Sequence, residues 1–171
     1  LSKNHRGFPC IKFSNFTHAV NFEKYDYRKA CVQLRGQYEN HFYAHELTAG
    51  QNVINTALEY SKKVLMKSLG NHFDNFDQKK VEAYMSTKNK IMIHTGSMKI
   101  LDGFKNVYNL RQDQMNESYE TLRDYGNLTG CSIPTVMRKA FLEKEKPGSK
   151  GLIVGITMGF GLDIVEVEKT F

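Results

Sequence analysis

The stretch "KIMIHTGSMKILDGF", residues 90–104, joins two different periodicities in the chain. Its first four residues form an apolar run that predicts a short buried strand. From Met98 onward the apolar residues return at helical spacing, as at Leu101 and Phe104. His94 and three small residues lie between them, in the kind of loop where functional side chains of α/β proteins gather. The stretch therefore predicts a strand–loop–helix unit of an α/β protein.

The same two periodicities extend to both sides of this unit. Helical spacing is predicted over residues 51–69, 98–108, 108–125 and 132–145, where Pro134 is compatible with a first helical turn. Strands are predicted over 10–20, 29–35, 90–94 and 152–168, the last as a hairpin closed by the turn "GFG". No repeat or low-complexity linker divides the chain, so residues 1–171 are predicted to form one α/β domain.

The composition of the chain indicates which compartment and which kinds of partner to expect. The longest apolar runs are a few residues, far below the roughly 18 that a membrane span needs. The three cysteines form no C-x-x-C pair, which favours a reducing compartment, and we expect a cytoplasmic protein. The net charge of +6 favours acidic partners but is dispersed, so on charge alone nucleic acid, a membrane surface and an acidic carrier protein all stay open as partners. Our expectation is no nucleic acid and no membrane.

Metal and cofactor motifs are not found in the sequence. His41 and His45 share a helical spacing, but "HFYAH" lacks the acidic residue of a zinc-protease motif and no third ligand follows from the pattern. Neither a phosphate-binding glycine loop nor a serine-hydrolase elbow occurs. We therefore expect no metal and no cofactor.

Three loop positions carry the remaining chemistry. His94 ends a predicted strand, Asn127 lies in "YGNLTG" before a helix, and "GFG" at 159–161 allows close backbone approach to a ligand. Taken singly, each has a structural explanation: a packed imidazole, a helix cap or turn residue, and a hairpin turn.

Taken together, the three stretches resemble a known family. "IMIHTGSMKILDGF", "LRDYGNLTGCSIPTVMRKAF" and "GLIVGITMGFGLDIVEV" resemble, in this order, the C-terminal half of thiolase-fold condensing enzymes of the β-ketoacyl-ACP synthase III and type III polyketide synthase group. The interval from His94 to Asn127 is similar to that of the plant-type polyketide synthases. "YGNLTGCS" resembles the family pattern Y-G-N-x-[ST]-[SA], and "GFGLDIVEV" resembles its terminal hairpin. The likeness covers residues 8–171 and is strongest from residue 88.

The resemblance implies a fold and a reaction. The fold is a thiolase-like half-domain, with a mixed five-stranded sheet and helices on its faces. The reaction is a decarboxylative Claisen condensation of acyl thioesters carried by CoA or an acyl carrier protein. His94 and Asn127 are implied as catalytic residues that polarise the thioester oxygen, since a neutral imidazole N–H and an amide N–H are suitable donors. Substrate contacts are expected at Thr95, Gly96, Ser97, Gly159, Phe160 and Gly161.

Two departures qualify this implication. The motif after the histidine is H-T-G-S, where the family has H-Q-A-N or H-P-G-G, so Ser97 replaces the second asparagine of the synthase III pattern. The nucleophilic cysteine of the family belongs to the N-terminal half, and Cys10, Cys31 and Cys131 do not match it. We therefore expect a Cys-bearing N-terminal half or subunit as a partner, and a homo- or hetero-oligomer. The alternatives are a noncatalytic subunit that shapes a partner's acyl tunnel and a stand-alone binding module.

Overall fold

The computed structural model describes residues 10–20, 32–36, 43–47, 55, 58–59, 61–62, 64–66, 77–156 and 161–170. The predicted contacts at Gly159 and Phe160 and the cysteine at position 31 lie outside these residues. The elements in chain order are the strands β1 (Ile11–Val20), β2 (Val32–Gly36) and β3 (Tyr43–Leu47), helix α2 (Gln78–Ser86), strand β4 (Lys90–Ile93), helices α3 (Met98–Val107), α4 (Gln112–Tyr125) and α5 (Ser132–Met137), and strands β5 (Lys150–Ile156) and β6 (Gly161–Lys169).

The main sheet contains four strands among the described residues, in the order β1-β6-β5-β4, which corrects the expected five. β4 and β5 are parallel, while β6 is antiparallel to both of its neighbours, so the sheet is mixed as predicted. Of the strand expected at 29–35, residues 32–35 belong to β2, and residues 29–31 lie outside the described residues. β2 pairs with β3 in a separate two-stranded sheet. Strand periodicity predicts an extended backbone but does not specify the strand that pairs with it. The sequence therefore could not show that β2 lies outside the main sheet.

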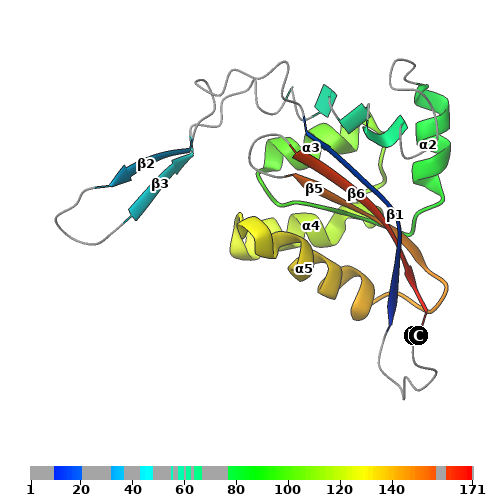
Figure 1. Ribbon diagram of the computed structural model, residues 1–171. Coiled ribbons are helices and arrows are strands. Elements are labelled where there is room, and N and C mark those ends of the chain that lie inside the picture. The colour runs from blue at the N-terminus through cyan, green and yellow to red at the C-terminus, as the bar shows by residue number, and fades with distance from the viewer. Residues whose placement is uncertain are drawn as a thin grey trace.

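Helices cover both faces of the four-stranded sheet, as Figure 1 shows. On one face the core includes Ile91, Ile93, Leu152, Val154 and Ile164, packed with residues of α2, α3 and α4. On the other face the core is formed by Met92, Val136, Ala140, Phe141, Ile153 and Val167, where the covering element is α5 with the π-helical turn Arg138–Leu142 that continues it. Near-continuous apolar residues in β4 and β5 thus follow from burial on both faces.

Most helix predictions between residues 98 and 142 are confirmed. The two helical segments predicted after residue 98 are α3 and α4, separated where Asn109 adopts a positive φ of 49°. The predicted helix 132–145 is α5 followed by its π-helical turn, which ends at Leu142. Residues 55, 58–59, 61–62 and 64–66 are helical, in agreement with the helix expected over 51–69. None of the described helices has the length and apolarity needed to cross a membrane.

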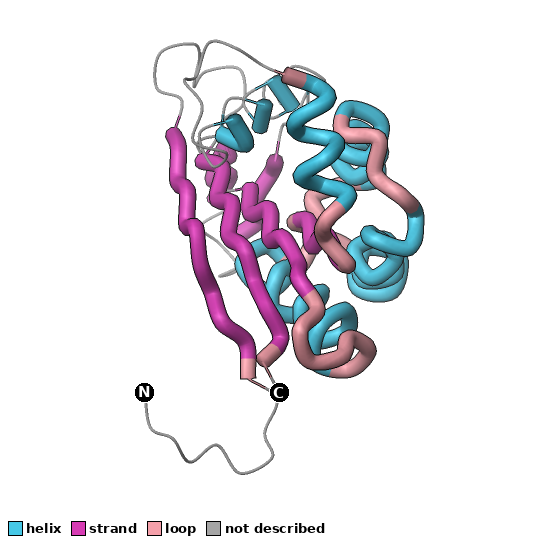
Figure 2. The backbone as a smooth tube through the Cα atoms, turned by 90° about the vertical axis from the view of Figure 1, so that its right-hand side faces the viewer, coloured by secondary structure: helices cyan, strands magenta, loops and turns pink. Residues whose placement is uncertain are grey.

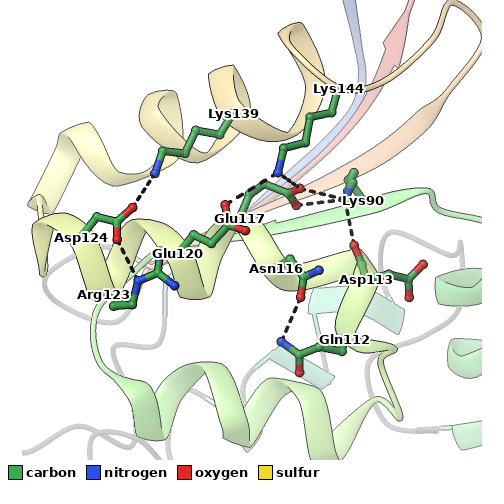
Figure 3. Close-up of polar contacts among 10 residues, drawn as sticks. All are labelled: Lys90, Gln112, Asp113, Asn116, Glu117, Glu120, Arg123, Asp124, Lys139 and Lys144. Carbon is green, nitrogen blue, oxygen red and sulfur yellow. Dashed lines mark hydrogen bonds and ion pairs between the residues drawn. The ribbon is translucent and has the colours of Figure 1, made fainter.

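A network of charged side chains holds α4 against β4 and against residues 139–144, which follow α5 (Figure 3). The Glu117 carboxylate, only 2% exposed, receives Lys90 Nζ at 3.0 Å and Lys144 Nζ at 2.9 Å. Farther along α4, Asp124 Oδ2 lies 3.1 Å from Lys139 Nζ. Figure 2, turned by 90°, shows the helices gathered beside the strands of the main sheet. Because α4 ends directly before Asn127, this network fixes the position from which the Asn127 loop starts.

Candidate active site

His94 directly follows β4, at the end of the sheet predicted for the site. Its backbone N–H donates to Val154 O at 3.0 Å, which extends the parallel ladder by one residue. Its carbonyl oxygen then accepts from Gly96 N–H at 2.9 Å, an i to i+2 bond that closes a tight turn. The chain therefore leaves the strand immediately after His94 and enters α3.

The imidazole of His94 is half-buried, and within the described part of the chain it makes no side-chain hydrogen bond. Desolvation by burial lowers its pKa below the ordinary value of 6.5, so the ring is neutral at pH 7. A neutral imidazole carries one N–H donor and one acceptor nitrogen. The ring is thus able to donate a hydrogen bond without bringing a positive charge to the site.

Gly96 makes room for this ring. A Cβ built at Gly96 would lie 3.3 Å from His94 Cδ2 and 2.9 Å from Ile100 Cδ1, closer than carbon atoms ordinarily pack. The next residue, Ser97, caps α3 by accepting from Ile100 N–H at 3.3 Å. A serine directly before an apolar helical repeat is a sequence signal for an N-cap, so this structural role was readable from the pattern.

Asn127 lies in the loop that follows α4, and its side chain is exposed. Its Oδ1 accepts from Thr129 N–H at 2.9 Å, the geometry of an Asx turn. Its Nδ2 lies 3.5 Å from the carbonyl oxygen of Gly96, at the outer limit of a hydrogen bond. Because the amide nitrogen carries two hydrogens, one remains for a ligand. The structure therefore brings the predicted residues His94, Gly96 and Asn127 to adjoining loops.

A second link joins the same loops beneath Asn127. Thr95 is fully buried, and its Oγ1 lies 3.3 Å from Gly126 O and 2.9 Å from Ser132 Oγ. Thr95 was predicted to contact substrate, whereas its hydroxyl here is directed into the protein. Ser132 was not among the predicted site residues, because the spacing of the sequence carries no signal that α5 starts beside β4.

A histidine–carboxylate pair lies at the same end of the sheet. His18 Nδ1 is 2.5 Å from Asp163 Oδ1, and Asp163 is paired with Gly155, the residue after Val154. Gly161, one of the predicted substrate contacts, opens β6 and pairs with Val20. The sequence could not reveal the His18–Asp163 pair, because it depends on the register between strands 145 residues apart.

No described group of three or more histidine, cysteine, aspartate or glutamate side chains is arranged to hold a metal ion. Of the described cysteines, Cys131 is exposed, four residues after Asn127, and Cys10 is half-buried beside β1. The two loops bring together a neutral imidazole and a side-chain amide, both of which are able to donate a hydrogen bond.

The model of the family "Chalcone and stilbene synthases, C-terminal domain" matches residues 52–169. The chain belongs to this family. Type III polyketide synthase C of Arabidopsis thaliana is 33% identical over 69 residues, which are 40% of this chain and 18% of that protein. As a member of the chalcone and stilbene synthase family, the chain carries both His94 and Asn127 inside the matched range.

Solved structures share the fold. PKS-I from the brown alga Ectocarpus siliculosus has a TM-score of 0.69 at 15% identity, over 99% of this chain and 42% of that chain. The C-terminal type III polyketide synthase domain of Steely1 from Dictyostelium has a TM-score of 0.66 at 18% identity, over 94% of this chain and 41% of that chain. OleA of Xanthomonas campestris has a TM-score of 0.66 at 15% identity, over 92% of this chain and 39% of that chain.

Together with the family match over residues 52–169, these likenesses identify the fold as that of the C-terminal domain of chalcone and stilbene synthases, a thiolase-like half-domain. The chain spans about two-fifths of each of these three solved chains. The predicted thiolase-like half-domain is therefore confirmed, and its main sheet has four strands among the described residues where five were predicted.

Proposed function

We propose that residues 1–171 form one thiolase-like C-terminal domain that supplies the His94–Asn127 part of a Cys-His-Asn site for decarboxylative Claisen condensation of acyl thioesters. The observation that carries the proposal is the approach of Asn127 Nδ2 to Gly96 O at 3.5 Å, which sets the amide beside the turn that follows His94. The family match and the neutral imidazole support it.

The reaction needs donors rather than charges at this position. A malonyl-type thioester loses CO₂, and the electron pair of the broken carbon–carbon bond forms an enolate with negative charge on the thioester oxygen. The imidazole N–H of His94 and the free amide N–H of Asn127 donate to that oxygen and stabilise the charge as it develops. Neither group is charged at pH 7, so the anion meets preorganised dipoles.

The carbon–carbon bond forms next. The enolate carbon attacks the carbonyl of an acyl group held as a thioester on the cysteine of an N-terminal half. The carbon–sulfur bond breaks, and the cysteine leaves as a thiolate, ready to be acylated again. We propose that this Cys-bearing half or subunit is the partner, and that Gly96, Ser97 and residues 159–161 line the CoA- or carrier-bound thioester.

The test uses the protein assembled with its Cys-bearing half. We expect His94→Ala to abolish both CO₂ release from malonyl-CoA and product formation. The cysteine should still be acylated, which mass spectrometry measures. His94→Gln, which keeps an N–H donor, should retain part of the decarboxylation. Asn106→Ala, at an exposed position of α3, is the control and should behave as the wild type.

Unchanged condensation in His94→Ala would show that the assigned role is wrong. If activity also persisted in Asn127→Ala, the chain would instead be a noncatalytic subunit that shapes the acyl tunnel of its partner. The two functions therefore make opposite predictions for the same pair of variants.

A further inference from the structure

The Thr95 hydroxyl lies between the two loops of the candidate site. Thr95 follows His94 in sequence, and Gly126 precedes Asn127. Its Oγ1 is 3.3 Å from Gly126 O and 2.9 Å from Ser132 Oγ, and the residue has no exposed surface. The buried hydroxyl of Thr95 therefore contacts Gly126, the residue before Asn127. The backbone of Thr95 is at the same time joined directly to His94.

Hydrogen-bond valence gives this contact a direction. A hydroxyl has one proton to donate and two lone pairs to accept. The carbonyl oxygen of Gly126 is only an acceptor, so Thr95 donates to it. Ser132 Oγ accepts from the same hydroxyl, so the single Thr95 proton faces two acceptors, Ser132 Oγ at 2.9 Å and Gly126 O at 3.3 Å. The Thr95 hydroxyl therefore bridges the first residue of α5 and the residue before Asn127.

Apart from the packing of α4 against β4, which fixes where it starts, the Asn127 loop has few hydrogen bonds to the His94 turn. Its other hydrogen bonds are local: Gly126 N–H donates to Leu122 O, Thr129 N–H to Asn127 Oδ1, and Cys131 N–H to Leu128 O. Across the described residues, the two loops are joined by the Thr95 contacts and by Asn127 Nδ2 with Gly96 O at 3.5 Å. Of these links, the Thr95–Ser132 contact is buried, the Thr95–Gly126 contact is partly buried, and that of Asn127 is exposed.

We propose that Thr95 and Ser132 are positioning residues that set the separation and orientation of the His94 and Asn127 donors; this proposal rests on the function proposed above. Thr95 acts through its hydroxyl and does not touch the substrate. A hydroxyl-bearing side chain at this position locks the two donors to one another, and its removal lets the Asn127 loop move relative to the His94 turn.

Three variants test this in the assembled protein. Thr95→Val keeps the shape of the side chain but removes the hydroxyl, and it should lower kcat for CO₂ release from malonyl-CoA by roughly 10- to 100-fold, because small misplacements of a reacting constellation have effects of this size. KM for malonyl-CoA and acyl loading of the cysteine should stay near the wild-type values. Thr95→Ser should restore most of kcat, and Ser132→Ala should fall between Thr95→Val and the wild type.

Two matched controls separate positioning from general loss of stability. Thr121→Val makes the same change at another fully buried threonine, whose Oγ1 has no hydrogen-bond partner among the described residues. Ser118→Ala removes a buried hydroxyl that accepts from Ile93 N–H at 3.0 Å, one residue before His94. Both controls leave Gly126 untouched and should keep kcat within about twofold of the wild type.

A structural readout makes the outcome independent of turnover. In ¹⁵N spectra of the assembled protein, Thr95→Val should shift the side-chain amide signals of Asn127 and speed hydrogen exchange at Gly126 and Asn127, while Thr121→Val should not. If Thr95→Val fails to fold, Ser132→Ala provides the same two readouts. The positioning role would be overturned if Thr95→Val had the kcat and the Asn127 signals of the wild type. If Thr95→Val does not fold, the same result in Ser132→Ala would overturn it.

Failure of the proposed function has a different signature. If His94→Ala retains decarboxylation, the proposed function is wrong, and the positioning role is judged by the Asn127 signals alone. If His94→Ala is inactive and Thr95→Val matches the wild type in both readouts, only the positioning role is wrong.

Discussion

The side-chain amide of Asn127 lies 3.5 Å from the carbonyl oxygen of Gly96, so two loops that are 31 residues apart in sequence meet at one end of the sheet. The same side chain accepts from Thr129 N–H through Oδ1. Asn127 thus has one polar atom that holds its own turn and another that faces the turn after His94. These two functions can be separated by substitution.

Asn127→Asp retains the oxygen that accepts from Thr129 and removes the amide donor. We expect the variant to keep the stability of the wild type and to lose kcat for decarboxylation by roughly 10²–10³-fold, the effect of removing one donor to a developing oxyanion. Asn127→Ala removes both interactions and should lower the melting temperature as well. Steady-state kinetics and thermal unfolding, measured on both variants, check this. Decarboxylation by Asn127→Asp at the wild-type rate would exclude the donor role.

Gly96→Ala is expected to displace the imidazole of His94. The added methyl group would lie 3.3 Å from His94 Cδ2 and 2.9 Å from Ile100 Cδ1, and the flexible end of Ile100 is able to give way. We therefore predict a loss of stability of about 1 kcal/mol together with a fall in kcat of at least tenfold. Chemical denaturation and single-turnover CO₂ release measure the two effects. An intact rate would mean that the ring position is not set by Gly96.

The pH dependence of stability should carry a signature of His94. Burial lowers the pKa of His94 below 6.5 in the folded protein, so the unfolded chain binds the proton more tightly. Its contribution to stability is complete above pH 6.5 and is lost as the pH falls from 6.5 toward the folded pKa. NMR titration of the His94 ring and urea unfolding between pH 7.5 and 5 measure this, in about half-unit steps. His94→Gln should remove this part of the dependence.

Two carboxylates, Glu117 and Glu166, should make the stability of the fold depend on pH below 4.5. Burial alone would raise the pKa of Glu117, but hydrogen bonds from Lys144 and Lys90 hold it below 4.5. Burial would likewise raise the pKa of Glu166, and hydrogen bonds from Tyr84 and Lys88 hold it below 4.5. The folded state therefore favours the ionised forms, and their contribution is lost as the pH falls below 4.5 through the folded values. The His94 effect begins at a higher pH, as the pH falls below 6.5.

The two ends of the Glu117 network should respond differently to substitution. Glu117→Gln leaves Lys90, whose side chain is only 12% exposed, without its counter-charge, and should destabilise the fold by about 3 kcal/mol. Lys144→Ala, at a side chain 48% exposed, should cost about 1 kcal/mol or less. Urea unfolding at pH 7 compares the two. Equal effects of both substitutions would contradict the burial argument.

Local periodicity explains how far the sequence alone was able to predict this protein. The apolar run of β4, the helical spacing of α3 and α4, and Pro134 in the first turn of α5 are local properties, because each element presents its apolar residues at its own repeat. The loop positions of His94 and Asn127 followed from the same pattern. The order of three motifs then predicted the family, which the match over residues 52–169 confirmed.

Only the tertiary structure decided which groups meet. Strand periodicity could not show that β2 pairs with β3 outside the main sheet, since a strand specifies its faces but not its neighbour. The burial of Thr95 depends on where α5 begins relative to β4, a packing relationship between residues 37 positions apart. The sequence by itself determined the elements and the residue types of the candidate site, because these are set by neighbours along the chain. The structure decided that His94 and Asn127 occupy adjoining loops and that a buried hydroxyl joins them, because those contacts arise only when separate elements pack together.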